Sequence, residues 1–146
     1  MKKQGTQNFE NHAQVIPAFH FFALPVLLIN VIWRLVLLKD GISFDSVIVA
    51  VLAIALLILA LSARNFALRV QDRIIRLEME LRLEKLLFGD QRARIGEFTV
   101  DQLIALRFAD DEELPVLARQ VLDEKLTDRK TIKRRIKNWR PDYMRA

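Results

Sequence analysis

Two stretches of this sequence contain no charged side chain and are long enough to cross a lipid bilayer. They are residues 15–33 and 46–63. A helix needs about 20 apolar residues to span about 30 Å of hydrocarbon. The same stretches could instead be buried helices of a soluble bundle, but a chain of 146 residues offers too few other helices to cover both on all sides. We therefore expect an all-α membrane protein with a transmembrane helical hairpin.

Charged residues lie mostly after the second apolar stretch. Residues 64–146 hold 19 of the 23 Lys and Arg and 15 of the 18 Asp and Glu. The connection at 39–45 carries one Lys and two Asp, whereas four Arg follow the second stretch at positions 64, 69, 73 and 76. Cytoplasmic flanks of membrane spans are enriched in Lys and Arg. Both termini are therefore expected in the cytoplasm, in agreement with Lys2 and Lys3 near the start.

Arg34 and Asp45 are expected to anchor the hairpin at the outer surface. Arg34 lies five residues before Lys39, so its guanidinium can reach the lipid headgroups. Asp45 lies at the start of the second span and could pair with Arg34. We do not expect an ion or proton path, because neither span contains a further carboxylate to continue one.

Other polar or special residues in the spans have structural interpretations. Pro25 removes a backbone donor in mid-span and should kink the first helix. Asn30 is expected to form a hydrogen bond between helices. His20 is expected to be interfacial or hydrogen-bonded, because a haem would need a histidine that the second span lacks. Small residues on one face of the second span would allow close approach of another helix: Ser46, Ala50, Ala53 and Ala60.

The helical pattern continues past the second span, since no Pro or Gly occurs from Val51 to Phe88. One row of apolar residues follows steps of four and three, interrupted at Glu84: Val70, Ile74, Leu77, Leu81 and Phe88. A second row is expected to widen this stripe: Leu68, Ile75, Met79, Leu83 and Leu86. Either the stalk pairs with a copy of itself, or the C-terminal helices fold back along it. A third arrangement, an amphipathic helix lying in the membrane surface, is less favoured because its acids would be repelled by anionic lipid. Acid-first ion pairs are expected for Asp72 with Arg76 and for Glu78 with Arg82.

Three short helices are expected after Gly89 and Gly96. Thr99 and Gln102 have the spacing of a capping box, which predicts the start of the first helix. Asp110 to Glu113 supply acids at the start of the second, with Pro115 in its first turn. Thr127 and Asp128 begin the third, which should continue to Trp139 and stop before Pro141. Their apolar residues are expected to form a core.

The expected architecture therefore has a second span that continues into a long cytoplasmic stalk helix with three short helices after it. Its segments are a polar N-terminal segment at 1–14, transmembrane helix 1 at 15–38, an outer turn at 39–45, transmembrane helix 2 at 46–63, the stalk at 64–88 and a C-terminal helical domain at 97–146.

A basic run near the end of the chain invites a functional interpretation. It contains Lys130, Lys133, Arg134, Arg135, Lys137 and Arg140. These cations could form an ordinary solvated face, or they could bind anionic lipid headgroups or an acidic protein. We do not expect nucleic acid as a partner, because no nucleic-acid-binding motif accompanies the run.

Catalytic and metal chemistry find little support in the residue types. The chain has no cysteine and two histidines, and these histidines lack the spacing of a zinc or di-iron site. No catalytic triad order or glycine-rich phosphate loop occurs. We therefore expect no enzyme activity and no cofactor, and we identify no small-molecule substrate.

Four stretches resemble a family of short bacterial two-span membrane proteins known only as a domain of unknown function. They are Gln7–His12, Val70–Leu83, Gln102–Pro115 and Ile136–Tyr143, and the resemblance extends over nearly the whole chain. It implies the bacterial inner (cytoplasmic) membrane as the location of a multi-pass protein. It implies no activity.

Two functional hypotheses follow from these patterns. The first is a non-enzymatic integral membrane scaffold or accessory subunit, which mediates protein–protein contact through its cytoplasmic helices. Its partners would be the lipid bilayer together with a second copy or a larger membrane protein complex. The alternative is a membrane-surface module that senses anionic lipid through the basic C-terminal helix.

Overall fold

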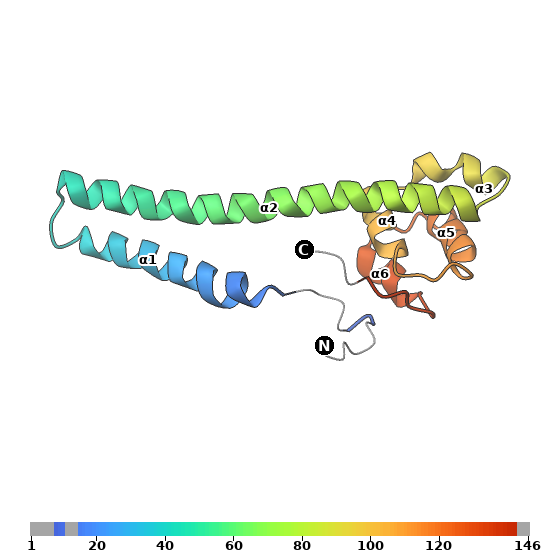
Figure 1. The fold of residues 1–146 in the computed structure, drawn as a ribbon, viewed down its shortest axis with the longest axis horizontal. Coiled ribbons are helices and arrows are strands. Elements are labelled where there is room, and N and C mark those ends of the chain that lie inside the picture. Colours follow the sequence, from blue (N-terminus) through green and yellow to red (C-terminus); the bar gives the residue numbers. More distant parts are fainter. Residues whose placement is uncertain (1–7, 11–14, 143–146) are drawn as a thin grey trace. The chain divides into compact units, whose positions relative to one another are not determined.

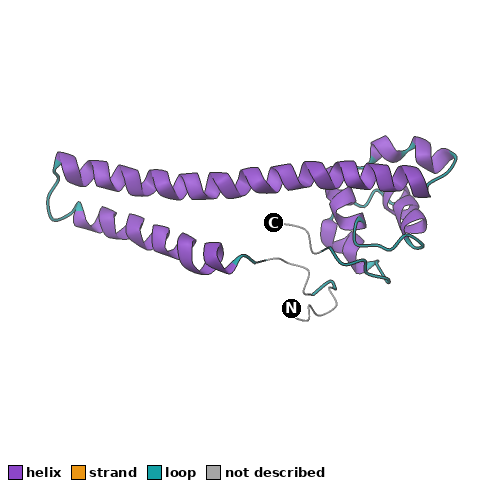
Figure 2. Ribbon diagram, in the orientation of Figure 1, coloured by secondary structure: helices purple, strands orange, loops and turns teal. Residues whose placement is uncertain are grey.

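The computed structural model describes residues 8–10 and 15–142 and is built from helices (Figures 1 and 2). No strand occurs within these residues, where the one backbone bridge joins Ala109 to Trp139. The expectation of an all-helical chain is thus confirmed for the described part. The chain forms two compact units, one of residues 15–68 and one containing residues 69–142. Helix α2, Phe44–Leu86, contributes to both.

The first unit is a helical hairpin. It contains a π-helical turn at Ala18–Ala23, helix α1 at Leu24–Leu37 and the first part of α2. Pro25 lies in the first turn of α1, directly after the π-helical turn. Because proline lacks an N–H and crowds the carbonyl four residues earlier, a wider turn before it accommodates the ring. The distortion expected at Pro25 thus takes the form of a π-helical turn. His20 is hydrogen-bonded as expected, with Nδ1 2.9 Å from the carbonyl oxygen of Ile16.

Helix α2 begins two residues before its expected start because two serines cap it. Ser43 Oγ accepts a hydrogen bond from the Ser46 N–H at 3.1 Å, and Ser46 Oγ accepts one from the Ser43 N–H at 2.9 Å. The Ser43 carbonyl then accepts the N–H of Val47 at 3.1 Å. Such reciprocal contacts satisfy backbone donors that a helix N-terminus leaves free.

Both helices of the hairpin are long and apolar enough to cross a membrane. One apolar helix covers Ala18–Leu37 and the other is α2; in their most apolar windows, 0% and 11% of the residues are buried. The two buried residues in the first part of α2 are Ala50 and Ala53, which lie on the small-residue face, and α1 and α2 run alongside each other in the hairpin (Figure 1). Large side chains elsewhere on the hairpin are uncovered, including Phe21, Ile29 and Leu59.

In the second unit, short helices pack against the C-terminal part of α2 (Figure 1). They are α3 at Asp90–Ala93, a 3₁₀ turn at Ile95–Glu97, α4 at Val100–Leu106, α5 at Leu114–Asp123 and α6 at Arg129–Arg134. Stalk residues Ile75, Met79 and Leu83 join one buried cluster with Leu103, Leu106, Phe108, Leu114, Val121 and Ile132. The C-terminal helices therefore fold back along the stalk, which is one of the three arrangements considered from the sequence.

The two apolar rows of the stalk do not form one wide stripe. Ile75, Met79 and Leu83 from the second row are buried, whereas all five members of the first row are exposed. Each residue turns an α-helix by about 100°, which places the two rows about 180° apart. The prediction of one widened stripe is therefore wrong, and the stalk has two opposite apolar faces.

The expected helix starts are confirmed, those of α4 and α6 by side-chain capping contacts. Thr99 caps α4 in a complete capping box: its hydroxyl accepts the Gln102 N–H, and the Gln102 side chain accepts the Thr99 N–H. Helix α5 begins at Leu114 with Pro115 in its first turn. The Asp128 carboxylate caps α6 by accepting the N–H of Thr131 at 2.7 Å. Local sequence thus fixes where these helices begin.

Helix α6 ends earlier than expected, at Arg134 rather than near Trp139. The backbone after it finds partners outside the helix. The N–H groups of Lys137 and Asn138 donate to the Glu113 carboxylate, and the N–H of Arg140 donates to the Phe108 carbonyl at 2.7 Å. Contacts with the α4–α5 loop therefore replace the last helical turn, and Pro141 is not what stops the helix.

Two valines on α5 provide a matched test of this core. Val121 is fully buried, whereas Val116 is 61% exposed. We expect Val121→Ala to lower the free energy of unfolding of the second unit by about 2 kcal/mol, since it removes buried methyl groups and leaves a cavity. Val116→Ala should change it by less than about 0.5 kcal/mol. Urea unfolding followed by Trp139 fluorescence in a Trp33→Phe background measures both, and equal effects would contradict the assigned core.

The capping of α6 predicts a pH effect. Hydrogen bonds from the Thr131 hydroxyl and backbone N–H lower the pKa of Asp128. The charged carboxylate therefore stabilises the fold above its unfolded pKa, near 4, and this contribution disappears as pH falls through the lower folded pKa. Asn caps helices without titrating, so the stability advantage of wild type over Asp128→Asn should shrink between pH 6 and about pH 3. Urea midpoints measured across that range would show parallel curves if Asp128 did not cap in its charged form.

Candidate interaction surface

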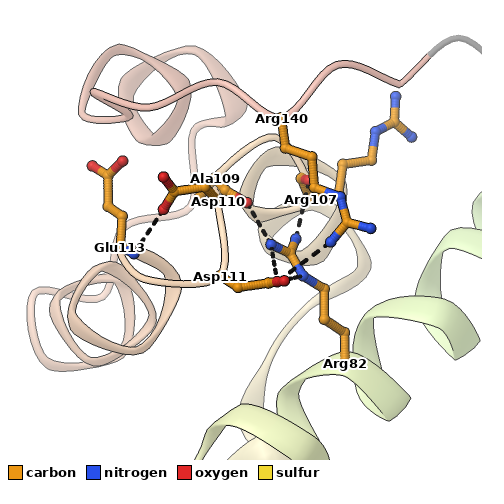
Figure 3. Close-up of polar contacts among 7 residues, drawn as sticks. All are labelled: Arg82, Arg107, Ala109, Asp110, Asp111, Glu113 and Arg140. Atoms are coloured by element: carbon orange, nitrogen blue, oxygen red, sulfur yellow. Dashed lines mark hydrogen bonds and ion pairs between the residues drawn. The ribbon is translucent and has the colours of Figure 1, made fainter.

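Arg82 connects the stalk to the loop between α4 and α5 (Figure 3). Its Nε donates to the Asp111 carboxylate at 2.7 Å, its Nη1 to the Arg107 carbonyl at 3.2 Å and its Nη2 to the Ala109 carbonyl at 2.6 Å. The side chain is only 14% exposed. Since the last carbonyls of a helix lack partners within it, the guanidinium satisfies acceptors just beyond the C-terminus of α4 and interacts favourably with the helix dipole.

The Arg82 contact replaces the ion pair expected within the stalk. Arg82 was expected to pair with Glu78, and Arg76 with Asp72. Instead Arg82 pairs with Asp111, and Arg76 lies 2.7 Å from the Glu80 carboxylate. A sequence pattern finds pairs within one helix, whereas the Arg82 contact joins residues 29 positions apart.

An open groove of about 780 Å³ lies beside the Arg82 contact. Its lining includes Arg82, Arg107, Arg140, Asp111 and Asp142. Arg140 pairs with Asp111 at 3.3 Å, and Arg107 Nε lies 3.3 Å from the Asp142 carboxylate. Each of these arginines thus lies beside a carboxylate of the same chain. The charges that line the groove therefore pair with one another, and the Arg82 pair joins the stalk to the loop.

Some cations of the basic run make contacts within the second unit. Lys133 is only 8% exposed, with its ammonium 5.0 Å from the centre of the Phe108 ring. The prediction of a basic surface is therefore wrong at Lys133, because the ring packs over its charge. Arg135 donates two hydrogen bonds to Glu124, at 2.8 and 2.7 Å. These bonds lower the pKa of Glu124 and raise the pKa of Arg135.

The remaining members of the run are exposed, and two of them make a side-chain contact within the chain. Lys130, Arg134, Lys137 and Arg140 have exposed side chains. The Arg134 guanidinium lies 5.6 Å from the centre of the Phe9 ring, and Arg140 pairs with Asp111. Tyr143, an aromatic residue that follows the run, lies outside the described residues. A uniform cationic face is therefore not what the run forms.

Arg34 and Asp45, the two expected anchors of the hairpin, are not joined by an ion pair within the described residues. Arg34 is half-buried on α1, and its Nε is buried without a hydrogen-bond partner. Asp45 lies in the first turn of α2, where a negative charge suits the helix dipole. Their role as interface anchors stays a prediction.

The stalk presents an uncovered apolar row, called here the exposed stripe: Val70, Ile74, Leu77, Leu81 and Phe88. Their exposed fractions are 56, 50, 61, 59 and 80%. Isolated exposed apolar residues are ordinary on protein surfaces, but an aligned apolar row is typical of an interaction site. The role of these residues in packing was predicted from their spacing. Within the described residues, the chain's own contacts leave them at least half exposed.

Comparison with known protein families finds a model that extends over the whole chain. A model described as "Family of unknown function (DUF6526)" matches residues 1–146. The chain belongs to this family. No curated protein and no solved structure matches it. The expected membership in a family of unknown function is confirmed, and the family adds no activity to the residue-level reasoning.

Arg82 and Arg76 offer a matched test of the stalk-to-loop contact. Arg82→Ala leaves three acceptors without their donor, and hydrogen bonds to charged groups contribute about 1.5–3 kcal/mol. We expect a loss of that size in the free energy of unfolding of the second unit. Arg76 is more than half exposed and pairs within its helix, so Arg76→Ala should cost less than about 0.5 kcal/mol. Trp139 fluorescence during urea unfolding measures both. An Arg82→Ala variant with unchanged free energy of unfolding would contradict a stabilising contact between the stalk and the loop.

Proposed function

We propose that this chain is a non-enzymatic integral membrane subunit, anchored by its hairpin, that contacts another protein chain through the stalk. The observation that carries the proposal is the pair of uncovered apolar surfaces, one on the hairpin and one on the stalk. Each needs a different cover: hydrocarbon for the hairpin and an apolar face of a protein for the stalk.

Lipid is the cover that suits the hairpin. Phe21, Ile29 and Leu59 are each more than 60% exposed, and the surrounding residues of both helices are apolar and uncharged. In water, burying such side chains gains about 25 cal/mol per Å², so a soluble chain would not leave them open. The first apolar helix, with 20 residues, would cover about 30 Å, which matches the hydrocarbon thickness.

The distribution of cations supports one orientation of the hairpin. Arg64, Arg69, Arg73 and Arg76 follow the second apolar stretch, whereas the turn between α1 and α2 is slightly acidic. By the positive-inside rule, both termini face the cytoplasm and the turn faces outward. In a bacterium this places the protein in the inner membrane with two spans, as the family resemblance suggested.

Protein is the cover that suits the exposed stripe. Its residues repeat with the spacing of a helix–helix contact, and charged side chains flank them on both sides: Arg73, Glu78, Glu80 and Lys85. A helix lying in the bilayer surface would instead bring these acids against anionic lipid. The stripe is therefore a protein-docking face.

The lipid-sensing alternative has less support from the contacts. Lys133 is buried, Arg135 is neutralised by Glu124, and Arg140 pairs with Asp111. Membrane attraction rises by about 1 kcal/mol for each basic residue near an anionic surface. With these three cations engaged, the basic run offers much less attraction than its sequence suggests.

A photo-crosslinking amino acid in place of Leu77 tests the proposed docking face in native membranes. We expect a discrete protein adduct of the full chain that resists extraction by alkaline carbonate, because the side chain lies against a neighbour. The same residue in place of Arg92, which is exposed on α3, is the control and should give none. Absence of an adduct at Leu77, or release of the chain by carbonate, contradicts the proposal.

A further inference from the structure

We infer that the exposed stripe pairs with the same stripe of a second copy of this chain, as a parallel, in-register, two-stranded coiled coil. This inference rests on the proposed function and names the docking partner. It is carried by the exposure of the stripe, its heptad register and the charges that flank it.

The stripe fits one heptad register. Ile74, Leu81 and Phe88 take the a positions, and Val70 and Leu77 take the d positions, with Glu84 at the next d. The expected knobs-into-holes contact of two helices needs a narrow apolar seam of this kind. All five apolar members are at least half exposed, so a second helix can reach the seam.

The flanking charges match a second copy in the same register. In a parallel coil, the residue at g faces the residue at e of the following heptad on the other helix. Here Arg73 at g faces Glu78 of the second copy, and Glu80 at g faces Lys85 of the second copy. Each pairing joins opposite charges and occurs twice by symmetry. Arg73, Glu78 and Lys85 are exposed, and Glu80 is partly exposed with one contact to Arg76.

The proposed membrane anchor fixes the relative direction of the two helices. Two copies inserted in one bilayer with the same topology present α2 in the same direction, so an antiparallel pair is excluded. The stripe covers about 27 Å of helix, or two and a half heptads, which is short for a coiled coil in solution. Confinement to one membrane raises the effective concentration of the two stripes and compensates for this length.

The opposite face of the stalk explains why two copies fit together. Ile75, Met79 and Leu83 are covered by the chain's own C-terminal helices, about 180° from the exposed stripe. In a symmetric pair, each copy therefore carries its C-terminal helices on the outer side. None of the described residues of the second unit lies across the seam, as the exposed fractions of Leu77 and Leu81 show.

Glu84 limits the strength of this pairing. At a d position it would face Glu84 of the second copy, and facing like charges oppose association. Glu84→Leu should therefore increase the fraction of paired chains. This expectation distinguishes a seam that includes Glu84 from one that ends at Leu81.

Disulfide crosslinking provides the first test, since the chain contains no cysteine. A single Leu77→Cys or Leu81→Cys substitution in the full chain places a thiol at a d or an a position, respectively, opposite the same thiol of the second copy. The variants are oxidised in native membranes. We expect crosslinked dimers several-fold in excess of those from Arg76→Cys, which lies on the same helix outside the seam. Equal crosslinking at Leu77, Leu81 and Arg76 overturns the inference.

Charge exchange provides the second test and controls for misfolding. In the Leu77→Cys background, Arg73→Glu and Glu78→Arg should each reduce crosslinking several-fold, because each brings like charges together at both flanks. Co-expressed, the two variants should crosslink to each other at least as well as the parent, since each supplies the charge the other lacks. No recovery in the mixed sample overturns the inference.

Failure of this inference is distinguishable from failure of the proposed function. If the photo-crosslinker at Leu77 gives an adduct with a different protein while Leu77→Cys chains do not crosslink to each other, the docking face stands and the second copy is wrong. If neither reagent gives an adduct at Leu77, both proposals are overturned.

Discussion

The whole architecture depends on α2 remaining one uninterrupted helix that contributes to both units. A helix satisfies nearly all of its backbone hydrogen bonds internally, so the same 43-residue element can lie in hydrocarbon along one part, as we propose for the hairpin, and in water along another. Side chains alone then decide what covers each face. Ala50 and Ala53 are covered within the hairpin, Ile75 and Leu83 are covered by the C-terminal helices, and the exposed stripe is left uncovered by the part of the chain that the structure describes.

Features governed by local chemistry were predictable from the sequence. Thr99 with Gln102 and Asp128 mark helix starts because their capping contacts involve residues only a few positions away. Pro115 marks the start of α5 because its fixed backbone angle suits the first helical turn. The absence of Pro and Gly predicted the continuity of α2. The same reasoning failed to recognise the Ser43–Ser46 cap, whose second member is a serine rather than the Glu or Gln of the usual capping box.

Features governed by distant contacts were not predictable. Helix α6 stops at Arg134 because Glu113 and Phe108, more than 20 residues earlier, bind the backbone that follows. Arg82 looked like a surface partner of Glu78 and instead holds the α4–α5 loop. Lys133 looked like part of a basic face and lies against Phe108. The two apolar rows of the stalk were misjudged for a simpler reason, because their angular separation was available from the helical repeat alone.

The most direct test of this account asks what surrounds the hairpin. Single spin labels along α2, attached to cysteines introduced one at a time in the full chain in lipid bilayers, report contact with dissolved oxygen or with a water-soluble nickel chelate. We predict that labels at Leu52 and Leu59 meet oxygen and exclude the chelate, and that a label at Arg73 meets the chelate. If Leu52 and Leu59 are as accessible to the chelate as Arg73, lipid does not cover the hairpin and the account is wrong.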